Sequence, residues 1–120
     1  MEFSLKGFAT IRIMVADVAA SRDWYRAFFG KEPTEDSPSF VSFKLDGAYL
    51  DLVQADGKNP FSPGGSVGYW HVSNLDAALA RARELGGQLY RGPLRVEEIK
   101  RNIAQIQDPF GNVIGLEAEF

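Results

Sequence analysis

The side chains most able to do chemistry in this chain are one histidine and a few charged or aromatic residues in predicted strands. His71 is the single histidine. Because an imidazole titrates near neutral pH, His71 could act as a general acid or base. It could also be a hydrogen-bonded structural group or a ligand contact. We favour this second role, which is the more common one for a lone histidine near the end of a strand.

Arg12 has two interpretations that stay open at this stage. Its guanidinium could bind a carboxylate or phosphate through two parallel hydrogen bonds. It could instead pair with Asp51 or with Glu117, because burying one of these charges without the other would be costly. For Asp51, pairing with Arg12 is the favoured role.

These residues belong to a pattern that occurs twice. A strand at Ile11–Val15 precedes a helix at Val18–Phe29, and a strand at Val67–Val72 precedes a helix at Leu75–Leu85. Apolar side chains follow helical spacing in both helices, which predicts that each covers one face of a sheet.

The helix boundaries are marked by residues of known capping chemistry. Asp17 and Asn74 precede the helices, and Gly30 and the pair Gly86-Gly87 follow them. Asp and Asn accept hydrogen bonds from the first helical turn, and glycine adopts the left-handed conformation that ends a helix. Asp17 and Asn74 are 57 residues apart, as are Gly30 and Gly87. This constant offset predicts two equivalent halves that enclose one cavity.

Extended segments follow each helix. In chain order they are Lys31–Thr34, Phe40–Leu45, Tyr49–Val53, Gln88–Tyr90, Ile103–Gln107 and Val113–Leu116, the first and fourth being the weakest. Asp46-Gly47 and Gly111-Asn112 have the residue types of tight hairpins. The sequence therefore predicts an α+β fold of two βαβββ modules.

Length and composition favour one compact domain over residues 1–120. Module one is expected at about 7–55, a Pro- and Gly-rich linker at about 56–65, and module two at about 66–119. A chain of 120 residues that is 45% hydrophobic can bury one core but not two independent ones.

Charge and composition also exclude several classes of function. The net charge of −3 gives no electrostatic basis for nucleic-acid binding. We expect no membrane span and no secretory leader, since no run of about 18 apolar residues occurs, and therefore a cytoplasmic protein. The absence of cysteine excludes disulfides, thiolate metal sites and cysteine nucleophiles.

The segment 92–101 carries the densest cluster of charges. It is expected to be a solvated loop or short helical turn, and the alternative is a lid over the cavity. Trp24 and Tyr25 are expected in the core or in a dimer contact, and Trp70 in the core.

Several motifs together carry a resemblance that covers nearly the whole chain. They are Val15-Ala16-Asp17, Trp24-Tyr25-Arg26, Phe29-Gly30, Val72-Ser73-Asn74-Leu75-Asp76-Ala77-Ala78-Leu79 and Asp108-Pro109-Phe110-Gly111-Asn112. On these motifs the sequence resembles the glyoxalase, bleomycin-resistance and extradiol-dioxygenase superfamily, also called the vicinal oxygen chelate fold. The resemblance implies two modules in an incomplete barrel, with the helices outside and the ligand in the cavity. It also implies a homodimer with its cavities near the interface.

Metalloenzymes of this family take their ligands from the first and last strand of each module, usually as histidine, glutamate or glutamine. The matching positions here are Thr10 and Asp51 in module one, and Val67 and Gly115 in module two. A divalent metal needs about three or four donors, and valine and glycine supply none. We therefore expect no cofactor and disfavour a divalent metal, although a degenerate site at Thr10 and Asp51 remains an alternative.

Strand alternation extends these four positions to a whole face of each sheet. The residues predicted to face a ligand are Thr10, Arg12, Met14, Tyr49, Asp51, Val53, Val67, Tyr69, His71, Val113, Gly115 and Glu117. Tyr49 and Tyr69 are the candidates for stacking. The apolar residues of the opposite face, such as Ile13 and Leu50, are predicted to pack under the helices.

The preferred function is that of a metal-independent small-molecule-binding protein, similar to bleomycin-resistance proteins. It would sequester or sense an aromatic or amphiphilic compound. The alternative is a glyoxalase-like lyase or isomerase, or a dioxygenase-type enzyme. Such an enzyme would be metal-free with His71 as proton carrier, or would use the degenerate metal site.

Overall fold

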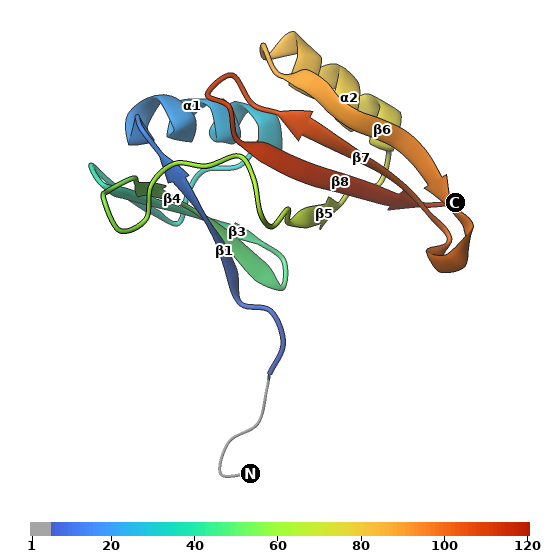
Figure 1. Ribbon diagram of the computed structural model, residues 1–120, viewed down its shortest axis with the longest axis horizontal. Helices are drawn as coiled ribbons and strands as arrows, with labels where there is room; N and C mark the ends of the chain where they lie inside the picture. The colour runs from blue at the N-terminus through green and yellow to red at the C-terminus, as the bar shows by residue number, and fades with distance from the viewer. Residues whose placement is uncertain (1–5) are drawn as a thin grey trace. The chain divides into compact units, whose positions relative to one another are not determined.

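The computed structural model describes residues 6–120, which divide into two compact units. The first unit runs to Phe61 and the second from Ser62 to Phe120, with Ala27–Phe29 grouped with the second. In Figure 1 the first unit is blue to green and the second is yellow-green to red. We describe each unit by itself.

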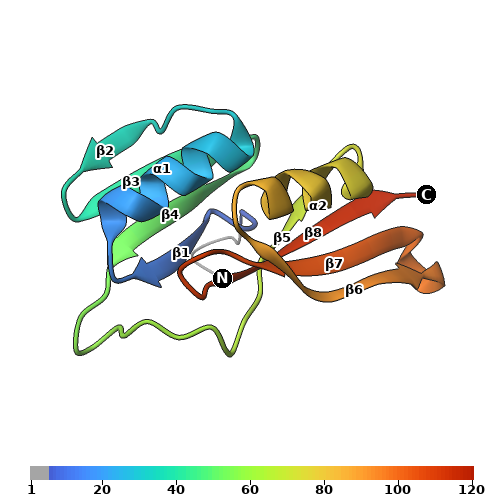
Figure 2. The same ribbon diagram turned by 90° about the horizontal axis from the view of Figure 1, so that it is seen from above.

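The first unit holds one helix and one four-stranded sheet. Its elements are β1 (Thr10–Val15), α1 (Val18–Phe29), β2 (Glu35–Ser37), β3 (Phe40–Leu45) and β4 (Ala48–Gln54). The strand order is β1-β4-β3-β2, with β1 parallel to β4 and the other pairs antiparallel. Figure 2 shows α1 lying over β3 and β4.

The second unit repeats this topology. Its elements are β5 (Tyr69–His71), α2 (Leu75–Glu84), β6 (Gln88–Val96), the 3-10 helix η1 (Glu97–Ile99), β7 (Arg101–Gln107) and β8 (Val113–Glu119). The order is β5-β8-β7-β6, again with one parallel pair, β5 and β8. The predicted α+β fold of two βαβββ modules is confirmed.

Both helices begin as their capping residues predict. The Oδ1 atoms of Asp17 and Asn74 accept from the backbone N–H groups of Ala20 and Ala77, each at 3.0 Å. Gly30 ends α1 with φ 66°, in the left-handed region. The second helix ends one residue earlier than predicted, at Glu84.

The apolar face of each sheet forms the core of its unit. In the first unit Tyr25, Phe43, Leu50 and Leu52 are fully buried, and Trp24 packs edge-on against Tyr25 with ring centroids 4.8 Å apart. The core position predicted for these two aromatic residues is confirmed. In the second unit α2 packs on β6, β7 and β8, over a core of Ala82, Ala104, Ile106, Ile114 and Leu116.

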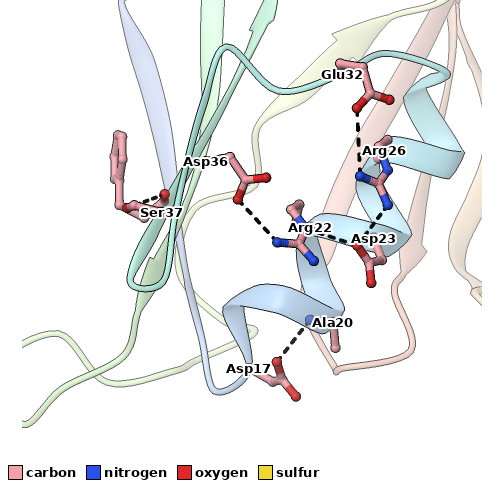
Figure 3. Close-up of polar contacts among 9 residues, drawn as sticks. Asp17, Ala20, Arg22, Asp23, Arg26, Glu32, Asp36 and Ser37 are labelled. Carbon is pink, nitrogen blue, oxygen red and sulfur yellow. Dashed lines mark hydrogen bonds and ion pairs between the residues drawn. The ribbon is translucent and has the colours of Figure 1, made fainter.

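An ion-pair network covers the outer surface of α1 and reaches the short strand β2. Arg22 donates to Asp23 at 3.0 Å and to Asp36 at 3.3 Å, and Arg26 pairs with Asp23 and Glu32 (Figure 3). The hydrogen bond to Asp23, which has the larger effect, and the hydrogen bond to Asp36 both raise the pKa of Arg22. The network links the helix to the edge of the sheet.

Two predictions were wrong close to proline residues, the position of one strand and the length of another. The weak strand expected at 31–34 lies instead at Glu35–Ser37, because Pro33 has no N–H to donate and pairing begins only with Thr34, whose N–H donates to Ser42. In the segment 92–101, the expected short helical turn is present only at Glu97–Ile99, and the part before it is strand rather than loop because β6 continues to Val96. Register shifts beside Gly92-Pro93 let this strand pass the proline and pair again with β7.

The strand predicted at 67–72 is also shorter than expected. It covers only Tyr69–His71, so Val67 lies before the strand rather than in it. Gly68 still accepts a hydrogen bond from the N–H of Gly115 at 2.9 Å, but a glycine has little strand propensity. Pairing with β8 by residue register therefore begins at Tyr69.

Candidate functional site

In the first unit, Arg12, Asp51 and Ser42 form one row across three neighbouring strands. Arg12 pairs with Asp51 across β1 and β4, and Asp51 pairs with Ser42 across β4 and β3. The Nε atom of Arg12 donates to Asp51 Oδ2 at 3.2 Å, and the Ser42 hydroxyl donates to Asp51 Oδ1 at 2.6 Å. Both carboxylate oxygens are therefore engaged, and the residue is 3% exposed.

The other end of this row is open to solvent. The side chain of Arg12 is 61% exposed, and among the described residues no group accepts from its two Nη atoms. Because the pairing uses only Nε, these Nη atoms can bind a carboxylate or another anionic group of a ligand.

The remaining predicted residues of the first unit lie on the same face. Thr10 is opposite Tyr49, and Met14 is opposite Val53, in the register of β1 and β4. Tyr49 is 38% exposed. These side chains flank the row of Arg12 and provide apolar surface beside a charged group.

In the second unit, Tyr69, Gly115 and Gln105 form the equivalent row. Tyr69 pairs with Gly115, and Gly115 with Gln105. The ring of Tyr69 occupies the space above Gly115, since a Cβ built there would lie 2.5 Å from Cγ and Cδ2 of the ring. The Nε2 atom of Gln105 donates to the Tyr69 hydroxyl at 2.8 Å, which fixes the far end of the ring.

The acidic residue Glu117 is held by a neighbour on the same sheet. Arg101 Nη1 donates to Glu117 Oε1 at 2.7 Å. Each of the two charges thus has a partner in its own unit, Arg101 for Glu117 and Arg12 for Asp51.

His71 lies in the row that follows Tyr69 on the same face of β5. Its Nε2 atom is 4.0 Å from Glu119 Oε1, and the two side chains are 58% and 70% exposed. The imidazole is thus accessible to a ligand. Its one described partner is a carboxylate in solvent rather than a buried group that would orient it.

Three residues of these rows were missed from the sequence: Ser42, Gln105 and Arg101. The signal was available, because alternation along β3 and β7 places them on the same face as Asp51 and Gly115. The expectation covered the first and last strand of each module but omitted the strand that pairs with the last one.

A separate groove of about 460 Å³ lies at the start of α2 and contains none of the predicted site residues. It is lined by Ser73, Asn74, Leu75, Asp76, Pro93, Leu94, Arg95, Asn102, Ala118 and Glu119. Its cation is already engaged, because Arg95 Nε donates to Glu97 at 2.8 Å and its guanidinium lies 3.5 Å from the ring centre of Phe120.

Two observations bear on metals and membranes. Among residues 6–120 no three His, Cys, Asp or Glu side chains gather in a way that could hold a metal ion. Within the same residues, neither helix has the length and apolarity needed to cross a membrane.

The two repeated modules, each with a helix on one face of its sheet and a polar row on the other, define an α+β protein of the glyoxalase-like fold. A profile of the Glyoxalase/Bleomycin resistance protein/Dioxygenase superfamily matches residues 7–116. The chain belongs to this superfamily, as the motifs of the sequence predicted.

Solved structures agree with this assignment at the level of fold. A glyoxalase/bleomycin resistance protein/dioxygenase family enzyme from Burkholderia phytofirmans PsJN has a TM-score of 0.79 at 18% identity, over 93% of this chain and 98% of that one. An antibiotic-binding protein from Streptomyces sp. CB03234 has a TM-score of 0.77 at 24% identity, over 98% and 99%.

A third similar structure has a different activity in its name. A lactoylglutathione lyase from Agrobacterium tumefaciens has a TM-score of 0.72 at 20% identity, over 95% of this chain and 94% of that one. A search of curated protein sequences finds no match. Binding proteins and enzymes thus share this fold, and the function depends on the side chains of the site.

Proposed function

We propose that this protein binds an aromatic or amphiphilic small molecule without using a metal ion, and that it sequesters or senses this compound rather than converting it. The observation that carries the proposal is the state of Asp51. It is the one carboxylate among the four positions from which the family draws metal ligands, and both of its oxygens already accept hydrogen bonds.

The other three positions do not supply the missing donors. Thr10 offers a hydroxyl, Val67 offers no side-chain donor, and the position of Gly115 is filled by the ring of Tyr69. A divalent cation at Asp51 would also have to displace Arg12, whose positive charge repels it. The residues at these positions do not fit the metal that the family implies.

The side chains on the same faces fit an organic ligand better. Within the first unit, Arg12 presents Nη atoms that no described group engages to an anionic or carbonyl group, and the partly exposed Tyr49 presents aromatic surface. The antibiotic-binding protein from Streptomyces, which has the same fold, supports a binding role of this kind.

The test is a screen of metal-free protein against a library of aromatic and amphiphilic compounds by native mass spectrometry. The protein is first treated with a chelator, and each hit is incubated, released by denaturation and weighed again. We expect at least one compound to bind at a fixed stoichiometry and to be recovered with unchanged mass. Absence of binding without added metal, or recovery of a product, would overturn the proposal.

Matched arginine variants locate the binding surface. Arg12→Met removes the guanidinium of the polar row, whereas Arg22→Met removes one from the outer surface of α1. For an anionic hit we expect Arg12→Met to weaken binding by about tenfold, which corresponds to one charge-assisted hydrogen bond, and Arg22→Met to leave it unchanged. Equal affinities of both variants would place the ligand elsewhere.

The enzyme alternative rests on His71 and is tested in the same screen. If the protein transforms a compound and His71→Ala abolishes the turnover, the protein is an enzyme with His71 as the proton carrier. We expect His71→Ala to leave every bound compound chemically unchanged, as the wild type does.

A homodimer remains an expectation from the family. Sedimentation velocity of the full chain, with and without a bound hit, measures it directly. A monomer under both conditions would contradict this expectation and would leave the binding proposal intact.

A further inference from the structure

We infer that Tyr69 is a fixed stacking platform for a planar ring that carries a carbonyl group next to an N–H or O–H group. This inference rests on the proposed binding function and names the class of ligand. It is drawn from the row of Tyr69, Gly115 and Gln105 in the second unit.

The first step is that the ring of Tyr69 is held at both ends. Its Cγ end lies where any side chain at position 115 would begin, so a glycine there is what makes the ring position possible. Its hydroxyl accepts a hydrogen bond from Gln105 at 2.8 Å. A ring fixed in this way loses little conformational entropy when a ligand stacks on it.

The second step is that part of the ring stays accessible. Tyr69 is 36% exposed although the backbone of Gly115 covers one side of its ring. An aromatic ring that is supported from below and open above offers a flat apolar surface. Planar aromatic groups stack on such a surface with a gain beyond that of area burial alone.

The third step is the hydrogen-bonding pattern at the edge of the ring. Because the Tyr69 oxygen accepts from Gln105 Nε2, the hydroxyl hydrogen is free to be donated to a ligand carbonyl. Among the described residues nothing donates to Gln105 Oε1, which can accept from a ligand N–H or O–H. The edge therefore presents a donor beside an acceptor, the complement of a lactam.

The fourth step concerns charge. Arg91 lies opposite Gln105 in the register of β6 and β7, and among the described residues no carboxylate pairs with it, whereas Arg101 pairs with Glu117 at 2.7 Å. A guanidinium beside Gln105 favours an electron-rich oxygen, such as the ligand carbonyl, over a cationic group.

The experiment uses three small probes in NMR titrations of the full chain. The first probe is 2-quinolone, a planar fused ring with a lactam edge. The second is octahydro-2-quinolone, which keeps the lactam but has no aromatic ring. The third is N-methyl-2-quinolone, which keeps the rings but has no N–H to donate.

Two leucine variants separate the platform from a general tyrosine effect. Tyr69→Leu removes the ring, and Tyr90→Leu removes another tyrosine of the second unit, 56% exposed on β6. We expect Tyr69→Leu to weaken binding of 2-quinolone roughly three- to tenfold, the range of an aromatic pair. Binding of octahydro-2-quinolone should not change, and Tyr90→Leu should change neither.

A second pair of variants tests the edge and guards against misfolding of Tyr69→Leu. Tyr69→Phe keeps the ring and removes the hydroxyl, and Gln105→Leu removes the amide. Tyr69→Phe should weaken 2-quinolone and N-methyl-2-quinolone alike, because both carry the carbonyl, whereas Gln105→Leu should lower the preference for 2-quinolone over N-methyl-2-quinolone. Stacking should persist in both variants. If Tyr69→Leu and Tyr69→Phe bind all three probes as the wild type does, Tyr69 only covers a glycine of the sheet and the inference is wrong.

The outcomes also separate this inference from the proposed function. Wild-type protein that binds library compounds but shows no preference for 2-quinolone over its saturated analogue overturns the platform and leaves the binding function standing. Wild-type protein that binds no compound of either set overturns both.

Discussion

Arg12 and Asp51 lie opposite each other on parallel strands, 3.2 Å apart, yet the side chain of Arg12 is 61% exposed and that of Asp51 is 5% exposed. The two partners of this ion pair therefore depend on it to different degrees. The exposed guanidinium of Arg12 can hydrogen-bond to water instead of Asp51. The buried carboxylate of Asp51 takes its hydrogen bonds from Arg12 and Ser42.

We expect the two donors to Asp51, the buried Ser42 and the exposed Arg12, to contribute unequally to the free energy of unfolding. Ser42→Ala leaves a buried oxygen of Asp51 without its donor and should cost about 1–3 kcal/mol. Arg12→Met should cost less than about 1 kcal/mol, because removal of the long exposed side chain admits water to the carboxylate. Urea denaturation measures both. Equal losses in the two variants would mean that Asp51 stays dry without Arg12.

The contact between Tyr69 and Gly115 predicts a clash that a second substitution relieves. Gly115→Ala should destabilise the protein by about 1–3 kcal/mol, because the new Cβ enters the space of the ring. The double variant Tyr69→Ala with Gly115→Ala should be less destabilised than the sum of the single variants. Gly47→Ala is the control, since a Cβ there meets nothing within 4 Å. Additive losses would contradict the contact.

The two N-caps should contribute equally, as expected of a structural repeat. Asp17→Ala and Asn74→Ala each remove a side-chain acceptor 3.0 Å from a backbone N–H, and each should cost about 1 kcal/mol. Asp17→Asn should retain most of the stability, because asparagine caps a helix nearly as well. Thermal unfolding of the three variants tests this; a costly Asp17→Asn would point to a role for the charge itself.

The ion pairs on the outer surface of α1 should matter little. The side chain of Arg22 is partly exposed, at 28%, and its ion pairs with Asp23 and Asp36 lie at the surface, where salt screens them. We expect Arg22→Gln to shift the urea midpoint slightly at low ionic strength and not at all in about 1 M salt. A shift that persists in high salt would show that Arg22 acts through packing on β2.

Metal uptake tests the state of Asp51 directly. After incubation with zinc, nickel, manganese or iron(II) and desalting, we expect mass spectrometry to find far less than one ion per chain. Arg12→Met frees one oxygen of Asp51, yet it should retain no more metal, because the other donors are still missing. Stoichiometric metal in the wild type would make a metalloenzyme the leading hypothesis.

The parts of the fold that depend on local chemistry could be predicted from the sequence. The bounds of α1 match because Asp17 and Gly30 act on their own helix ends. The position of β2 and the length of β6 could not be predicted. They depend on where backbone pairing with β3 begins after Pro33, and on whether pairing with β7 resumes after Pro93.

The candidate site divides in the same way. The pairing of Arg12 with Asp51 could be proposed because alternation places both on one face. The position of the Tyr69 ring over Gly115 could not be predicted. Alternation says which face of the sheet a side chain is on, but not toward which neighbouring strand it leans.

The 57-residue offset that relates the two modules also relates Arg12 to Tyr69, and each begins a row of three residues at the same register of its own sheet. The same register position thus carries an ion pair in one module and an aromatic ring over glycine in the other. Because the side-chain hydrogen bonds of each row stay within its own sheet, a substitution in one row leaves those of the other unchanged. The charged end and the aromatic end of this fold can therefore be altered independently.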